Sequence, residues 1–333
     1  MKIFKIDREA TGIRSSFSYY FALVLVSALL CSAQILSTEA TNPRGPKQPA
    51  DINPIGNNRP GQQVNPLQGH FRVTLNGFKV NHQTNQGLWA SWDTVTITRH
   101  VALVDASGQP HLVNWGTSDD RIGATPQSRL HGGSATTSGG LQTRDNFPTA
   151  SPWRLNSPPV ELNGLPPSRY FEDEITQNSN AVVILPDIWV VDPNNRLISR
   201  NLDLQGAYHR QIDHDLPVLG RAVARIIRGP QPLALDSYLR PGASMGLNNA
   251  VRLPIGVPQD RPIGMQPERE QFGFVPQVLV LTFDSARFIA HKDFGFGMGV
   301  VPIRYVDHPS FAGDYTLYVQ VDECRPDRFT NRC

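Results

Sequence analysis

The chain lacks the features that mark several common protein classes. Hydrophobic residues make up only 39% of its 333 residues, and 28 prolines with 27 glycines account for about one residue in six. No repeat of fixed period and no heptad run occurs, which excludes solenoids and coiled coils. The composition instead favours a loop-rich β protein that carries some unstructured chain.

Familiar motifs of catalysis and metal binding give little guidance. The sequence contains no H-E-x-x-H and no EF-hand loop, and its single G-x-S-x-G match, GASMG at residues 242–246, lies in a loop-like passage. These motifs mark common serine hydrolases, zinc proteases and calcium sensors. A catalytic site, if there is one, would therefore be dispersed along the chain.

Long apolar runs are rare, and one of them lies near the N-terminus. Residues 1–18 are polar with four basic side chains, residues 19–30 are apolar, and CSAQ follows from residue 31. This order matches the n-, h- and c-regions of a secretory signal over residues 1–33. Twelve apolar residues are few for a membrane span of about 20, but a retained signal anchor stays the alternative. The sequence thus predicts export to a secreted, cell-surface or periplasmic location.

Net charge gives no sign of a nucleic-acid or lipid partner. The formal charge of +2 falls to zero once residues 1–33, with four basic and two acidic side chains, are removed. A neutral chain lacks the field that draws proteins to phosphate backbones or anionic membranes. We therefore expect no nucleic-acid partner, and membrane contact only through a retained N-terminal segment.

Only three cysteines occur. Cys31 leaves with a cleaved signal, so that Cys324 and Cys333 remain as an even pair in an oxidising compartment. A disulfide between them would close a short loop and contribute about 2–3 kcal/mol to stability. The alternative is two free thiols at the C-terminal end.

Composition divides the rest of the chain into two regions. Residues 34–69 are rich in Pro, Asn and Gln and have almost nothing to bury, which predicts a disordered stalk. Residues 70–333 contain the strand-like segments and are expected to form a single β-rich domain. Polar passages at about 116–168 and 229–272 predict two long loops within this domain.

Several segments alternate apolar with polar residues, as HFRVTLNGFKVN does from residue 70, with a change of phase at Asn76-Gly77. NAVVILPDIWVVD, from residue 180, is nearly continuously apolar, and Pro186 within it requires a bulge or an edge position. The pattern predicts an antiparallel β-sandwich, or a related barrel, of about seven to nine strands. One or two short helices would pack on it. Helices are too few for a doubly wound α/β fold.

The segment YHRQIDHDLPVLGRAVARIIRG, residues 208–229, has the period of a helix and places two histidines and two aspartates close together. Because Pro217 suits the first turn of a helix, Asp215 is expected to be the N-cap of a second helix starting near Leu216. At 100° per residue one face is apolar, comprising Tyr208, Ile212, Leu219, Val223 and Ile226.

Metal binding is a weak hypothesis. His209 and Asp213 are one helical turn apart, which makes half of a zinc site at best, and a solvated contact is the favoured interpretation. Acidic loop residues could supply oxygen ligands for calcium, and the candidates are Asp119, Asp120 and Asp192. Ordinary turn chemistry explains Asp192 equally well. No cofactor is therefore predicted, and calcium stays possible.

Three hypotheses about function remain. The first is a secreted or surface-tethered β-sandwich that acts as a non-catalytic binding or scaffolding module for an unknown protein or glycan ligand. The second is an extracellular hydrolase with a dispersed, metal-assisted site on the two long loops. The third is an N-terminally anchored envelope protein with a protein partner. Whether the chain is an enzyme stays open, with a non-enzyme favoured.

Overall fold

The computed structural model describes residues 66–84, 93–117, 122, 140–148, 151–153, 165–191, 198–230, 234–249, 251–254 and 260–325. All of them fall within one compact unit, Gln63–Cys333. The predicted signal and most of the predicted stalk lie outside the described residues, as do Asp119, Asp120, Asp192 and Cys333. Within the described part, no helix is both long and apolar enough to cross a membrane.

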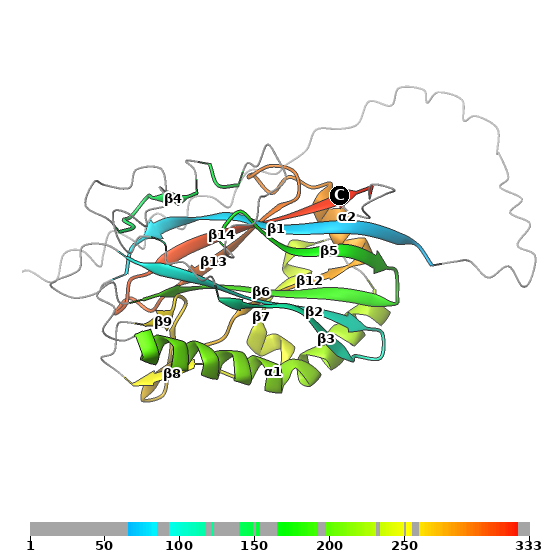
Figure 1. The fold of residues 1–333 in the computed structure, drawn as a ribbon. Coiled ribbons are helices and arrows are strands. Elements are labelled where there is room, and N and C mark those ends of the chain that lie inside the picture. The colour runs from blue at the N-terminus through cyan, green and yellow to red at the C-terminus, as the bar shows by residue number, and fades with distance from the viewer. Residues whose placement is uncertain are drawn as a thin grey trace, which may run out of the picture. The chain divides into compact units, whose positions relative to one another are not determined.

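Two antiparallel sheets pack against each other (Figure 1). The first has the order β13 (Val300–Val306), β14 (Asp314–Cys324) and β1 (Gln68–His82), and the far edge of β1 pairs with β4 (Asn146–Phe147) and β5 (Ser168–Thr176). The second has the order β3 (Pro110–Thr117), β2 (Val95–Asp105), β6 (Asn180–Val190), β12 (Gln277–Thr282) and β7 (Leu239–Pro241), and β9 (Arg261–Pro262) also pairs with β6. This arrangement confirms the predicted mainly β, sandwich-like fold.

The described residues contain fourteen strands rather than seven to nine, because several strands are too short for alternation to reveal them. A small third sheet joins β10 (Gln266–Glu268), β11 (Gln271–Phe274) and β8 (Val251–Pro254). The described parts of the polar passage 229–272 thus carry short strands, with two 3₁₀ helices, η1 (Leu235–Ser237) and η2 (Gly242–Met245).

The core between the sheets follows from the sequence pattern. Phe71, Val73 and Leu75 of β1 are fully buried, and so is Val101 of β2. The pairing of β1 with β14 shifts register between Leu75 and Gly77, which is the expected change of phase. A side chain at Gly77 would overlap the backbone of β4, so the close approach of the two strands requires glycine there.

Pro186 occupies an unpaired stretch of the β6 edge. On this edge β12 pairs with residues 181–184 and β9 with residues 189–190, so nothing in the ladder faces residue 186. The hydroxyl of Tyr305 from β13 fills the gap, donating to the carbonyl of Pro186 at 2.7 Å and accepting from the backbone N–H of Gln277 at 3.1 Å. The expected bulge or edge position is therefore wrong, because β6 is a central strand and Pro186 pairs with Arg99 of β2 in an unbroken register. Proline is tolerated there because no strand on its other side needs its missing N–H.

Two α-helices complete the fold. The short helix α2 (Phe283–Ala290) begins at Thr282, whose side chain forms a capping box with Ser285. The long helix α1 (Ile198–Arg228) lies across the outer face of the second sheet, against β2, β3 and β6 (Figure 1). Gly220 of α1 packs directly on Gly108 in the turn between β2 and β3, where a side chain at position 220 would meet the carbonyl of Gly108.

The expected break in α1 is wrong. The helix runs for 31 residues with Pro217 inside it, and Asp215 is not an N-cap. Its carboxylate is buried and accepts hydrogen bonds from the backbone N–H of Asn248 at 3.0 Å and from the side chain of Gln211 at 3.1 Å. The packing of the helix on the sheet thus offsets the free energy that is lost because Pro217 cannot donate a backbone hydrogen bond.

Candidate functional site

His209 belongs to a buried pair of histidines. Its Nδ1 lies 2.9 Å from Nε2 of His100 on β2. Asp213 is exposed on α1 and makes no hydrogen bond or ion pair with His209 among the described residues. Burial lowers the pKa of His100 to about 3, helped by the neighbouring His209, and lowers that of His209 to about 4. Both rings are therefore neutral at pH 7, and one donates its N–H to the other.

The histidine pair is part of a polar layer between α1 and the second sheet. Asp187 of β6 is fully buried, and its carboxylate accepts hydrogen bonds from the hydroxyls of Tyr208 on α1 and Tyr305 on β13. Desolvation raises the pKa of Asp187 to about 7, although these hydrogen bonds act in the opposite direction. These groups have the chemistry of acids and bases, but Asp187, Tyr208 and His100 have no exposed surface through which a substrate could reach them.

A second buried network joins β9 to the segment that follows β13. The guanidinium of Arg261 is fully buried and makes two hydrogen bonds to Asp307, at 2.9 and 2.8 Å, and stacks 4.3 Å from the ring of Phe311. Asp307 also accepts from the backbone N–H groups of Gly264, Met265 and Gly313. Because the charges are neutralised inside the fold, this network holds chain segments together rather than facing a ligand.

Metal sites find little support in the described residues. Among them, no group of three or more His, Cys, Asp or Glu side chains could hold a metal ion. A pocket of about 620 Å³ is lined by several ionisable side chains, including Asp173, Glu174, His291 and Glu323. Arg287 lies 3.6 Å from Glu323 and partly neutralises it, and His291 lies at the same distance, so these side chains form a surface polar cluster.

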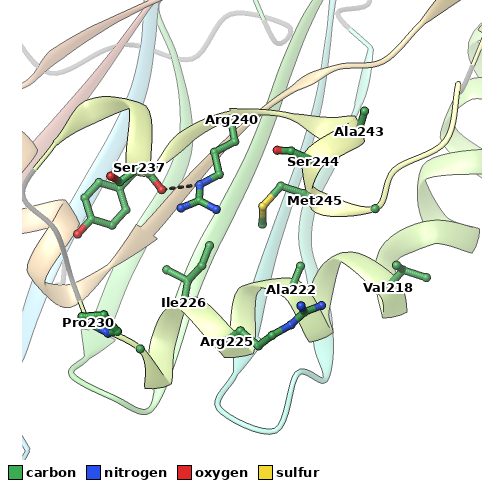
Figure 2. Close-up of a pocket in the computed structure, with 13 residues that line it drawn as sticks. Val218, Ala222, Arg225, Ile226, Pro230, Ser237, Arg240, Ala243, Ser244 and Met245 are labelled. Atoms are coloured by element: carbon green, nitrogen blue, oxygen red, sulfur yellow. Dashed lines mark hydrogen bonds between the residues drawn. The ribbon is translucent and has the colours of Figure 1, made fainter.

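A different pocket combines apolar walls with unpaired positive charge. It has a volume of about 520 Å³ and lies between the C-terminal half of α1 and residues 237–246, which include β7 and η2 (Figure 2). We call it the α1–β7 pocket. Its size falls in the range of small-molecule sites, about 300–1,000 Å³. Val218, Ala222 and Ile226 line it from α1, and Met245 lines it from η2.

Two arginines line the α1–β7 pocket: Arg240 points from β7 towards α1, and the exposed Arg225 extends along α1 (Figure 2). The Nε of Arg240 donates to the carbonyl of Ser237 at 2.7 Å, and that of Arg225 donates to the carbonyl of Arg221 at 3.4 Å. Neither guanidinium forms an ion pair within the described residues, and no Asp or Glu lines the pocket. The pocket therefore carries two formal positive charges.

The walls of the α1–β7 pocket are held in place by hydrogen bonds. Strand β7 is paired with β12, and Gly242 donates to the carbonyl of Pro276 at 2.8 Å. On the other side, Asp215 of α1 bonds both the backbone and the side chain of Asn248, just beyond η2. Gly246, at φ +86°, allows the chain to turn tightly against Val218. The pocket is thus preformed rather than a loose gap between segments.

The sequence interpretation missed this pocket. It placed Ile226 on the apolar face of the helix, and Arg240 fell within the predicted loop at about residues 229–272. In the structure Ile226 is half-buried, because it lines the pocket, whereas Ile227 is 1% exposed. Arg225 and Arg240 are fifteen positions apart, so only the tertiary fold brings them together.

The predicted disulfide stays a prediction, since Cys324 ends β14 and Cys333 lies outside the described residues. Comparison of the chain with protein-family models, with curated proteins and with solved structures found no match.

Proposed function

We propose that the protein is a non-catalytic binding module that takes a small ligand in the α1–β7 pocket. The observation that carries this proposal is the combination of a preformed pocket of about 520 Å³, apolar side chains on both walls and two arginines without ion-pair partners. Pockets of this size and lining are the usual sites of small ligands.

The proposal includes export of the protein. A signal at residues 1–33 would direct it out of the cytoplasm, and the stalk of residues 34–69 would hold the β-sandwich away from a membrane if the signal stays uncleaved. The Cys324–Cys333 disulfide belongs to the same proposal. N-terminal sequencing of the mature protein and mass spectrometry of non-reduced peptides test these two features separately.

Binding can be tested by blocking the α1–β7 pocket. A library of small organic ligands is screened by thermal shift against the full chain, and each hit is tested again on Ala222→Trp. Ala222 lines the pocket, so an indole there should fill it. Ala207→Trp is the matched control, because Ala207 is an exposed residue of the same helix and does not line the pocket.

We expect hits that raise the melting temperature of the wild type and of Ala207→Trp but not of Ala222→Trp. Hits that stabilise Ala222→Trp equally well would contradict the proposal. Chemical conversion of a hit during incubation, followed by mass spectrometry, would favour the hydrolase instead.

A further inference from the structure

The two halves of α1 are attached to the second sheet by different kinds of contact. C-terminal to Pro217, the buried face of the helix is aliphatic and comprises Leu219, Val223 and Ile227. N-terminal to Pro217, three buried side chains form hydrogen bonds to the sheet: Gln205, Tyr208 and His209. The bond from Gln205 to the hydroxyl of Thr96 measures 3.0 Å. Because water can replace such hydrogen bonds, the N-terminal half is the more easily detached part of the helix.

The sheet surface beneath this N-terminal half is polar. Five side chains of β2 and β6 share the face that α1 covers, and we call them the polar patch: Thr96, Thr98, His100, Asp187 and Trp189. The Nδ1 of His100 and the Nε1 of Trp189 are buried and have no hydrogen-bond partner among the described residues. An unpaired buried polar atom costs free energy that contact with water recovers. The docked helix therefore covers groups that gain hydrogen bonds when it lifts.

Pro217 divides the two halves of α1. Since proline has no N–H, the helical hydrogen bond that would end on the carbonyl of Asp213 is missing, and the proline ring crowds that carbonyl. Sharp bends in helices occur mostly at such positions. Asp215 is tied to the backbone N–H and the side-chain amide of Asn248. The helix is thus anchored from Asp215 onwards and weakened just before that point.

We propose that residues 198–213 of α1 form a lid that bends at Pro217 and lifts from the second sheet while the C-terminal half stays packed. Lifting exposes the polar patch, including the carboxyl of Asp187 and the imidazole of His100. Both residues are completely buried under the docked helix, so a dissolved molecule reaches them only when the lid is open. The lid is separate from the proposed binding function, because the α1–β7 pocket is lined by the anchored half of the helix.

Modification of histidine rings by diethyl pyrocarbonate, located by mass spectrometry of the full chain, tests the lid. The reagent reacts with rings that solvent reaches. His100 is completely buried, so it reacts only when the lid opens or the whole protein unfolds. His214, whose side chain is 79% exposed on the same helix, serves as the internal reference for the reagent.

Urea separates the two routes to His100. Global unfolding exposes far more surface than a local opening and therefore accelerates steeply with urea. We expect modification of His100 that is measurable without urea and changes little with urea below the unfolding transition. This measurement needs no variant, so it does not depend on the folding of an altered chain.

Gln205→Ala removes a bond between the lid and the sheet. One such hydrogen bond corresponds to a factor of about five in the opening equilibrium, so His100 should react about fivefold faster. Gln211→Ala is the matched control, because Gln211 lies on the same helix and bonds Asp215 of α1 rather than the sheet. It should change the rate less than twofold. Pro217→Ala restores the missing helical bond and should slow the reaction at least tenfold.

The outcomes bear on separate parts of the proposal. Modification of His100 only at urea concentrations that unfold the whole protein would overturn the lid. Equal acceleration in Gln205→Ala and Gln211→Ala would overturn the attachment of the lid through Gln205. An unchanged rate in Pro217→Ala would overturn the hinge at Pro217.

Discussion

Asp187 should make the stability of the protein depend on pH. Its carboxyl is fully buried beneath α1, and desolvation raises its pKa from the usual 3.8 to about 7. The folded protein therefore holds a proton on this group at pH values where the unfolded chain has lost it. The stability that this protonated carboxyl contributes is fully present below about pH 4 and is lost as the pH rises to about 7.

The size of the effect follows from the shift. Between pH 5 and pH 7 each pH unit changes the free energy of unfolding by about 1.4 kcal/mol. Between pH 5 and pH 8 this one group should cost the wild type about 3 kcal/mol. Asp187→Asn keeps an oxygen that accepts from the hydroxyls of Tyr208 and Tyr305 and cannot ionise, so the variant should lack this loss.

Other groups titrate in the same range, so the difference between variant and wild type is the quantity to measure. His100 and His209 have lowered pKa values, so the stability they contribute is present above pH 6.5 and is lost as the pH falls from there. Both histidines are present in both proteins, and their effect cancels in the difference. Urea unfolding of the two full chains at pH 5, 6, 7 and 8 gives the four differences.

We expect the stability of Asp187→Asn relative to the wild type to rise by about 3 kcal/mol from pH 5 to pH 8. A difference that does not change with pH would refute the reasoning, because it would mean that the buried carboxyl titrates alike in the folded and unfolded chains.

Three further predictions concern stability. Asp307→Ala should destabilise the fold by about 3–5 kcal/mol in urea unfolding, since it leaves the buried charge of Arg261 without its partner, and replacing both residues by apolar ones should recover much of the loss. Asp215→Ala should cost about 1–3 kcal/mol by removing the acceptor for Asn248, and should also weaken ligand binding in a thermal-shift titration. Pro217→Ala should raise stability by about 2 kcal/mol, because the backbone hydrogen bond and relief of the proline clash outweigh the freedom that the unfolded chain gains; a lower melting temperature would contradict this.

The sandwich could be predicted because its strands obey a period of two. The change of phase at Asn76-Gly77 appears in the structure where the pattern places it, and Pro186 lies in the central strand β6 beside a gap in the pairing on one side. These features are local, since each follows from the alternation of neighbouring side chains or from the missing N–H of proline.

The helix and the pocket could be predicted only in part. The buried face of α1 follows from its period, but local rules for Pro217 and Asp215 favoured a break that tertiary packing overrides. The partners of Asp215 and His209 lie 33 and 109 positions away in the chain, so no local pattern reveals them. The same holds for Arg225 and Arg240, whose chemistry becomes visible only when the two walls of the pocket meet.

The most direct test of the binding proposal is a crystal structure of the full chain with a ligand from the thermal-shift screen. We expect electron density for the ligand in the α1–β7 pocket, against Ala222, Ile226 and Met245. A ligand bound elsewhere on the protein, with the pocket holding only water, would contradict the proposal.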